Sequence, residues 1–190
     1  MGSFDYRLFH AVNGLAGQVG WLDTLVARFA EASPYIVIGL LVVLWFLGRG
    51  PQRALDRQAV IHALLATALA AGTGTLLANA IGRTRPFLVH PAHVLVAKSF
   101  DASFPSIHAT AAFAVATAVL FYNRTMGIVF LALAGLIALS RVFIGLHYPG
   151  DVVGGALLGA GCAAALLAAR PLLSRATRLV DTAWSWAHLP

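Results

Sequence analysis

The sequence predicts an all-α integral membrane protein, a bundle of five transmembrane helices preceded by short amphipathic helices at the membrane interface. Its 190 residues are 59% hydrophobic and only 11% charged, whereas a soluble domain carries about 25% charged residues. The mean hydropathy is +0.82. The apolar residues gather in five runs, and the arginines fall at the ends of these runs. The length is typical of one domain, here residues 1–190.

The five apolar runs are the expected membrane spans. They cover residues 33–47, 58–81, 107–122, 126–140 and 152–169. Several are shorter than the roughly 20 residues that cross the hydrocarbon core of a bilayer, so we expect flanking residues to extend them. Small residues recur every three or four positions in the second and fifth runs, a spacing that lets helix backbones approach closely. Packing is the preferred interpretation of these small residues.

The two ends of the chain differ from the spans. Residues 1–31 alternate apolar and polar side chains at helical spacing, broken by Gly14, Gly17 and Gly20. This pattern favours one or two amphipathic helices lying in the interface, with a tilted sixth span as the alternative. Residues 170–190 carry three arginines and are expected to form a cytoplasmic tail. The single cysteine, Cys162, leaves no partner for an internal disulfide.

The distribution of arginine predicts the orientation in the membrane. With five spans, the first and third loops and the tail share one side, which holds seven basic and two acidic residues; the other side holds six basic and five acidic residues. The side richer in basic residues should be cytoplasmic. No basic run carries the interleaved aromatic residues of a nucleic-acid groove, so the bilayer, and not nucleic acid, is the expected partner of these charges.

This topology brings two polar stretches to the outer face. In the second loop, Arg85 offers a planar fork of donors, and the Ser106–Ile107–His108 stretch opens a helix whose free N–H groups favour an anion. In the loop before the last span, Arg141 offers a second fork suited to phosphate oxygens. Together these groups indicate a phosphate site.

The second stretch also carries a candidate nucleophile. His147 and Asp151 are four residues apart, so if the last helix included His147, Asp151 would accept a hydrogen bond from its Nδ1. Such a bond would leave Nε2 free to attack phosphorus, and His108 could protonate the departing oxygen. The pattern favours phosphoryl transfer, and neither a metal nor a cofactor is expected, because guanidinium groups can neutralise the transition-state charge.

Three motifs carry a family resemblance. RPF from Arg85, PSIH ending at His108, and SRVFIGLHYPGD ending at Asp151 resemble, in order and spacing, the signature motifs of the type 2 phosphatidic acid phosphatase superfamily. The resemblance covers roughly residues 75–160, the expected catalytic region. Shorter matches, FHAVNGLAG, WLD and AEASPY, resemble the bacitracin-resistance-type undecaprenyl-diphosphate phosphatases within that superfamily.

The resemblance implies roles for the site residues. His147 would form a phosphohistidine supported by Asp151, and His108 would donate to the leaving group. The phosphate would be held by a set of side chains and one backbone N–H: Arg85, Ser106, Arg141 and Ile107.

The sequence departs from the family pattern at two positions. Ala78 stands where the family usually has lysine, so a cation or donor for the phosphate would have to come from another residue, namely Arg83, Asn79 or Lys98. Ile107 stands where the family usually has glycine, which would make a positive φ costly there.

The expected function is hydrolysis of undecaprenyl diphosphate to undecaprenyl phosphate and inorganic phosphate. The reaction would recycle the lipid carrier of cell-wall biogenesis at the outer face of a bacterial cell (inner) membrane. Three alternatives remain open: a broader phosphatase acting on phosphatidylglycerol phosphate or phosphatidic acid, a transferase that passes the phosphoryl group to another lipid, and a non-catalytic lipid-binding or carrier protein. An oriented histidine argues against the last, because binding alone needs no nucleophile.

Overall fold

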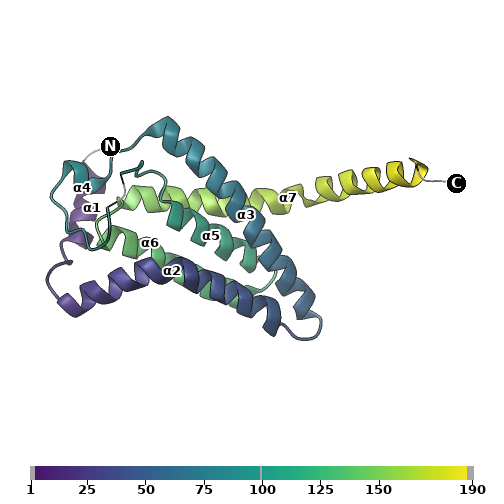
Figure 1. Cartoon of the computed structure of the whole chain (residues 1–190), viewed down its shortest axis with the longest axis horizontal. Helices are drawn as coiled ribbons and strands as arrows, with labels where there is room; N and C mark the ends of the chain where they lie inside the picture. Colours follow the sequence, from purple (N-terminus) through teal and green to yellow (C-terminus); the bar gives the residue numbers. More distant parts are fainter. Residues whose placement is uncertain (1–2, 99, 188–190) are drawn as a thin grey trace.

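The chain folds as a bundle of helices, as Figure 1 shows. A computed structural model describes residues 3–98 and 100–187. Within these residues no strand occurs, and the helices are α1 (Ser3–Asn13), α2 (Gly20–Leu47), α3 (Gln52–Ile81), α4 (Pro86–Val89), α5 (Ile107–Leu120), α6 (Arg124–Phe143) and α7 (Pro149–Ala187). The predicted all-α fold class is confirmed.

Four segments are long and apolar enough to cross a membrane. They are Gly20–Phe46, Gln52–Val89, Arg124–Phe143 and Pro149–Ala169. The fifth apolar helix, α5, has only 14 residues, which at 1.5 Å per residue is about 21 Å, short of a bilayer core of roughly 30 Å. α5 packs against α3, α6 and α7, so it lies among the other helices (Figure 1) and does not need to match the thickness of the lipid.

At the amino-terminal side the expected boundary of the first span is wrong, and at the other end the tail is helical. α2 begins at Gly20, so residues 20–31 continue into the first span and are not a separate interfacial segment. The charged residues of this stretch, Asp23, Arg28 and Glu31, lie in the amino-terminal half of a long helix, and only α1 remains a separate amphipathic helix. At the other end, α7 continues to Ala187, so the predicted tail is helical as far as this residue and extends away from the bundle (Figure 1).

The contact between α5 and α7 depends on glycine. A Cβ added to Gly155 would lie 2.7 Å from the Ser106 carbonyl oxygen, and one added to Gly159 would lie 2.8 Å from the Ala114 nitrogen. The backbones therefore approach as closely as the spacing of small residues predicted. This approach lets the Ser106 N–H donate to the Asp151 carbonyl oxygen at 3.1 Å, which places the starts of α5 and α7 side by side.

We predict that Gly159→Ala destabilises the protein by about 1–3 kcal/mol, because the added methyl group would overlap backbone atoms of α5. The measurement is thermal or denaturant unfolding in detergent. Gly161→Ala is the matched control on the same helix, since a Cβ there would meet nothing within 4 Å. Equal stability of the two variants would contradict the close α5–α7 packing.

Candidate active site

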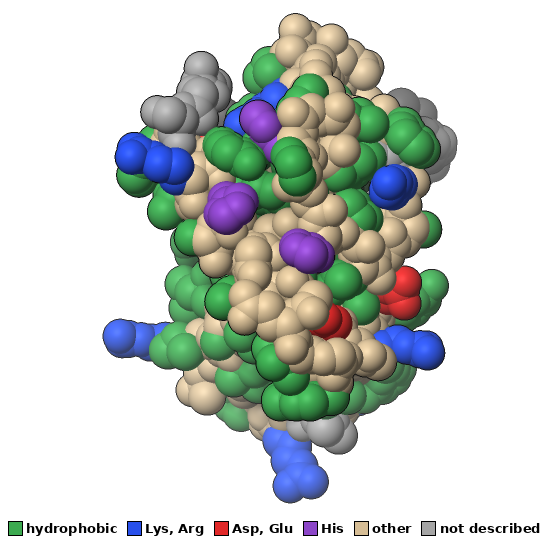
Figure 2. Space-filling view, turned by 90° about the vertical axis from the view of Figure 1, so that its left-hand side faces the viewer, with side chains coloured by type: hydrophobic (Ala, Val, Ile, Leu, Met, Phe, Trp, Pro, Cys, Tyr) green, Lys and Arg blue, Asp and Glu red, His purple; other side chains and the backbone are tan. Residues whose placement is uncertain are grey.

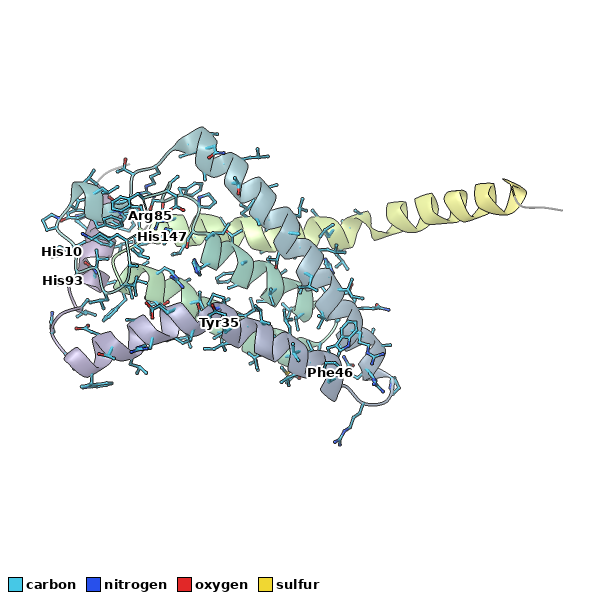
Figure 3. All side chains as sticks on the ribbon, in the orientation of Figure 1. His10, Tyr35, Phe46, Arg85, His93 and His147 are labelled. Atoms are coloured by element: carbon cyan, nitrogen blue, oxygen red, sulfur yellow. The ribbon has the colours of Figure 1, made fainter. Side chains whose placement is uncertain are left out.

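The predicted site residues meet at the end of the bundle where α1 and α4 lie. Figure 3 shows Arg85 and His147 together at this end, with Phe46 at the other, and Figure 2 shows histidine side chains on the surface of the same end. Five predicted residues are buried there, with exposed fractions of 0 to 5%: Arg85, Ser106, Arg141, His147 and Asp151.

His147 is oriented by a backbone carbonyl. Its Nδ1 lies 2.8 Å from the carbonyl oxygen of Ser103, so Nδ1 carries the proton and Nε2 carries the lone pair. The Asp151 carboxylate is farther, with Oδ2 3.7 Å from Nδ1. The expected direct bond to Asp151 is therefore corrected to a bond to Ser103. The reason is that α7 begins at Pro149, so His147 precedes the helix and the four-residue helical spacing does not apply.

Asp151 supports the histidine through the same serine. Its side chain is fully buried, and Oδ2 accepts hydrogen bonds from the Ser103 hydroxyl at 2.5 Å and from the Tyr148 N–H at 2.9 Å. Oδ1 accepts from Arg83 at 2.6 Å. Since Ser103 donates to Asp151 and accepts from His147, the carboxylate fixes the segment that fixes the imidazole. Sequence reasoning missed Ser103 because its carbonyl, present in every residue, does the orienting.

Arg85 contacts the other ring nitrogen of His147. Its Nη1 lies 3.2 Å from Nε2 and donates to the Leu146 carbonyl oxygen at 3.1 Å. Its Nη2 forms an ion pair at 2.9 Å with Asp101, whose side chain is 68% exposed. The guanidinium is thus adjacent to the lone pair of the histidine and held by a carboxylate at the surface.

Two further donors near this point have no partner among the described residues. Ser106 Oγ and Arg141 Nε are both buried and unbonded, although Arg141 Nη2 donates to the Ala30 carbonyl oxygen. An unsatisfied buried polar group costs about 1–3 kcal/mol and is rare. Ser106 before α5 and Arg141 on α6 therefore each offer a donor that an oxyanion could bind.

The start of α5 adds backbone donors to this site. Ser106 precedes the helix, Ile107 is its first residue, and the first N–H groups of a helix have no partner within it. No non-glycine residue of the described chain has a positive φ, so Ile107 in place of glycine causes no strain. Its side chain is 43% exposed, so what Ile107 offers to an anion is its backbone N–H.

His108 connects the anion site to an apolar cavity. It interacts electrostatically with Arg141, His147 and Arg85. It also lines a cavity of about 470 Å³ whose other walls come from α2, α3, α5 and α6. His108 is therefore close both to the buried arginines and to an apolar cavity.

The three auxiliary candidates do not complete the anion site in this structure. Arg83 donates to two carboxylates, Asp5 and Asp151, at 2.6 Å each. Asn79 is exposed near the end of α3, and Lys98 lies 5.7 Å from the ring centre of Phe87. Within the described residues no group of three or more His, Cys, Asp and Glu side chains is arranged to hold a metal.

Burial also tunes the candidate nucleophile. Desolvation lowers the pKa of His147 below its ordinary value, and the nearby Arg85 charge acts in the same direction, against the opposing effect of Asp151. A lowered pKa keeps the imidazole neutral at neutral pH. A neutral imidazole with a proton on Nδ1 and a lone pair on Nε2 is the form that can attack phosphorus.

Comparison with known proteins identifies relatives of this arrangement. The PAP2 superfamily matches residues 59–175. The undecaprenyl-diphosphatase BcrC of Bacillus subtilis (strain 168) is 31% identical over 79% of this chain and 76% of its own length. An undecaprenyl-diphosphatase of Sulfolobus acidocaldarius is 30% identical over 82% of this chain and 73% of its own. The crystal structure of Aquifex aeolicus LpxE is similar with a TM-score of 0.72 and 27% identity, covering 87% of this chain and 96% of that one.

We predict that Ser106→Ala weakens binding of orthovanadate, an analogue of phosphate, about tenfold, because a hydrogen bond to a charged group contributes roughly 1.5–3 kcal/mol. Its stability should hold, since the hydroxyl has no partner in the described structure. Calorimetric titration in detergent measures the binding. Ser140→Ala, which removes a buried hydroxyl bonded within its own helix, is the control, and equal vanadate affinity of the two variants would exclude Ser106 from the anion site.

Proposed function

The chain belongs to the PAP2 superfamily and is a membrane phosphatase, and we propose that its reaction is the hydrolysis of undecaprenyl diphosphate to undecaprenyl phosphate and inorganic phosphate. Two relatives that match most of the chain carry the name undecaprenyl-diphosphatase. The observation that carries the proposal is the pair of unbonded buried donors, Ser106 Oγ and Arg141 Nε, in a site whose histidine presents a lone pair.

In the proposed first step, the Nε2 of His147 attacks the terminal phosphorus. The bond from Nε2 to phosphorus forms while the bond from phosphorus to the bridging oxygen breaks, and undecaprenyl phosphate leaves. Burial and the nearby Arg141 charge lower the pKa of His108 in the free site, and the negative charge of the bound diphosphate would raise it again, so that His108 takes up a proton. His108 then gives this proton to the bridging oxygen, which lowers the cost of its departure. Arg85, Arg141 and Ser106 bind the equatorial oxygens, where charge accumulates in the transition state.

In the second step, water attacks the phosphohistidine. The bond from oxygen to phosphorus forms, the bond from phosphorus to Nε2 breaks, and His108 takes a proton from the water because it lost its own in the first step. Inorganic phosphate then leaves. The Ser103 carbonyl supports both steps, because it keeps the proton on Nδ1 and so keeps Nε2 as the reacting atom.

The apolar cavity beside His108 supports a substrate with a hydrocarbon tail. Its walls are almost entirely apolar, and the residues that form them include Pro34, Val37, Leu41, Leu64, Ala68 and Ala71. They belong to α2 and α3, both long enough to span the bilayer. A lipid can therefore place its tail between these helices while its diphosphate reaches the buried donors.

We predict that the wild-type protein in detergent releases phosphate from undecaprenyl diphosphate in the presence of EDTA, and that His147→Ala does not. The reason is that histidine and arginine supply the nucleophile and the charge stabilisation. The measurement is phosphate release, together with mass spectrometry of peptides quenched in alkali, which should find phosphate on His147 of the wild type. Activity that chelation abolishes, or that the variant retains, would overturn the mechanism.

A substitution in the cavity wall tests the identity of the substrate separately from the mechanism. Ala71→Phe adds bulk to the wall of the cavity and should slow undecaprenyl diphosphate more than farnesyl diphosphate, whose tail is shorter. Ala80→Phe, at an exposed position on the same helix outside the cavity lining, is the matched control. If phosphatidylglycerol phosphate were hydrolysed faster than undecaprenyl diphosphate by the wild type, the proposed substrate would be wrong while the mechanism could stand.

We also propose that the site faces the extracytoplasmic side of a bacterial cell membrane. The side of the membrane that holds the loop between α3 and α5 has a smaller excess of basic over acidic residues than the other side, and the side richer in basic residues is usually cytoplasmic. In a Cys162→Ser background, Ala97→Cys should react in intact cells with a maleimide that cannot cross membranes, and Arg124→Cys should react only after permeabilisation. Both positions are exposed. The opposite labelling pattern would place the site in the cytoplasm.

A further inference from the structure

Arg83 binds carboxylates on two helices that are far apart in the sequence. Its Nη2 lies 2.6 Å from Asp5 Oδ2 on α1, and its Nη1 lies 2.6 Å from Asp151 Oδ1 on α7. The guanidinium also stands over the ring of Tyr148, 4.2 Å from its centre. Both ends of the fork are thus occupied by carboxylates, which leaves Arg83 poorly suited to bind a phosphate.

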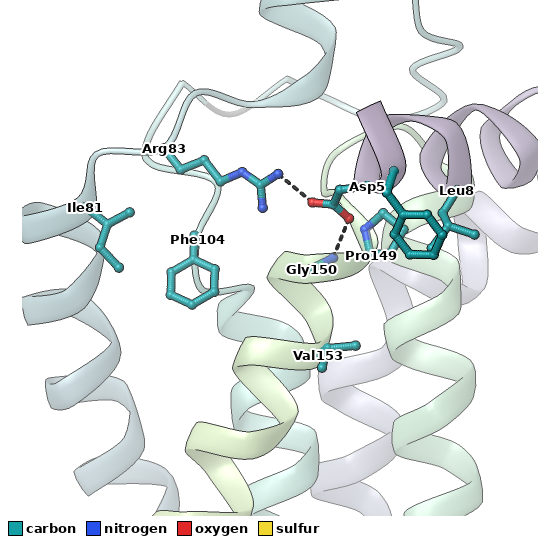
Figure 4. Close-up of a pocket in the computed structure, with 9 residues that line it drawn as sticks. Asp5, Leu8, Ile81, Arg83, Phe104, Pro149, Gly150 and Val153 are labelled. Atoms are coloured by element: carbon teal, nitrogen blue, oxygen red, sulfur yellow. Dashed lines mark hydrogen bonds and ion pairs between the residues drawn. The ribbon is translucent and has the colours of Figure 1, made fainter. Parts of the chain in front are cut away.

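Asp5 makes a second contact that fixes the start of α7. Its Oδ1 accepts a hydrogen bond from the Gly150 N–H at 2.8 Å, as Figure 4 shows beside the ion pair with Arg83. A Cβ added to Gly150 would lie 2.9 Å from Asp5 Oδ2, so the approach is close. A carboxylate at a helix N-terminus is favourable, because it satisfies a free N–H group and the helix dipole.

Arg83 also holds the segment that orients the nucleophile. Its carbonyl oxygen accepts from the Ser103 N–H at 2.7 Å, and Ser103 in turn accepts from His147 Nδ1 at 2.8 Å. Through its side chain Arg83 holds Asp151, which accepts from the Ser103 hydroxyl at 2.5 Å. The backbone of Arg83 therefore holds Ser103 directly, and its side chain holds Ser103 through Asp151. Ser103 in turn sets the tautomer of His147.

We propose that Asp5 and Arg83 are a positioning pair for His147. Asp5 holds the guanidinium of Arg83 and the first turn of α7, and Arg83 holds Asp151 and Ser103 so that Nε2 points at the substrate. The inference rests on the proposed function, in which His147 is the nucleophile. It also assigns a role to α1: the site is complete only when this helix is docked and delivers Asp5.

The test is a double-mutant cycle on turnover. Asp5→Asn keeps an oxygen that can accept from Gly150 but removes the charge that holds Arg83. It should lower kcat for undecaprenyl diphosphate roughly tenfold to hundredfold, because small displacements of a reacting group have effects of this size, with KM changed less than about twofold since no substrate contact is lost. In an Arg83→Gln background the same change should have little further effect.

Two variants guard against a purely structural effect. Asp23→Asn is the matched control, since this carboxylate also binds a backbone N–H, that of Gly17, without contacting Arg83, and its kcat should be that of the wild type. Arg83→Lys keeps the charge but cannot span two carboxylates, so it should lower kcat while folding normally. A raised KM with unchanged kcat in the Arg83 variants would overturn the inference in favour of phosphate binding, and so would additive effects in the cycle.

A lipid-free reaction distinguishes failure of this inference from failure of the proposed substrate. Phosphoramidate can phosphorylate a histidine: the bond from phosphorus to its nitrogen breaks, the bond to Nε2 forms, and ammonia leaves. Phosphorylation of His147, followed by mass spectrometry, should be slower in Asp5→Asn than in the wild type. This result would support the positioning pair even if undecaprenyl diphosphate were not hydrolysed, and equal rates in the two proteins would overturn it.

Discussion

The buried carboxylate of Asp151 is the constraint on which the end of the bundle near α1 and α4 depends. A charge removed from water in an apolar protein is costly unless it is paired and hydrogen-bonded. Asp151 meets this requirement with donors from three segments, Arg83 after α3, Ser103 before α5 and Tyr148 before α7. Each segment is held in place by the hydrogen bond that it donates to this carboxylate. The three segments together form the walls of the site around His147.

The packing of α5 against α7 makes this convergence possible. Glycines on α7 let the start of α5 come within hydrogen-bond distance of the Asp151 backbone, and this brings Ser106 to the same point. Because α5 is short and enclosed by longer helices, its N-terminus can lie below the ends of its neighbours. In the proposed function, a phosphate bound there would meet helix N–H groups and arginine side chains, with the apolar cavity beside it. The same arrangement of helices would then serve both the headgroup and the tail of the lipid.

Residue type explains what the sequence could predict and what it could not. Arg85, Arg141 and His147 were identifiable because ionisable residues are rare in an apolar chain and need a purpose or a partner. Ser103 and Asp5 were not, because a backbone carbonyl gives no signal in the sequence and Asp5 meets Arg83 across 78 positions. The start of α2 was misplaced because charged residues in its first turns looked interfacial. Whether His147 belonged to the last helix stayed open, because spacing alone does not tell where α7 begins.

If His147 is the nucleophile, as proposed, its contact with Arg85 would link substrate binding to the availability of Nε2. Without substrate, Arg85 Nη1 lies 3.2 Å from Nε2, so the lone pair that would attack phosphorus is engaged by a cation. In the proposed reaction the phosphate oxygens attract the same guanidinium, which would have to give up part of its hold on Nε2 and on Asp101. Burial lowers the pKa of His147, so the freed nitrogen stays unprotonated at neutral pH. In the proposed reaction, binding of the phosphate would thus free Nε2 when phosphorus comes within its reach.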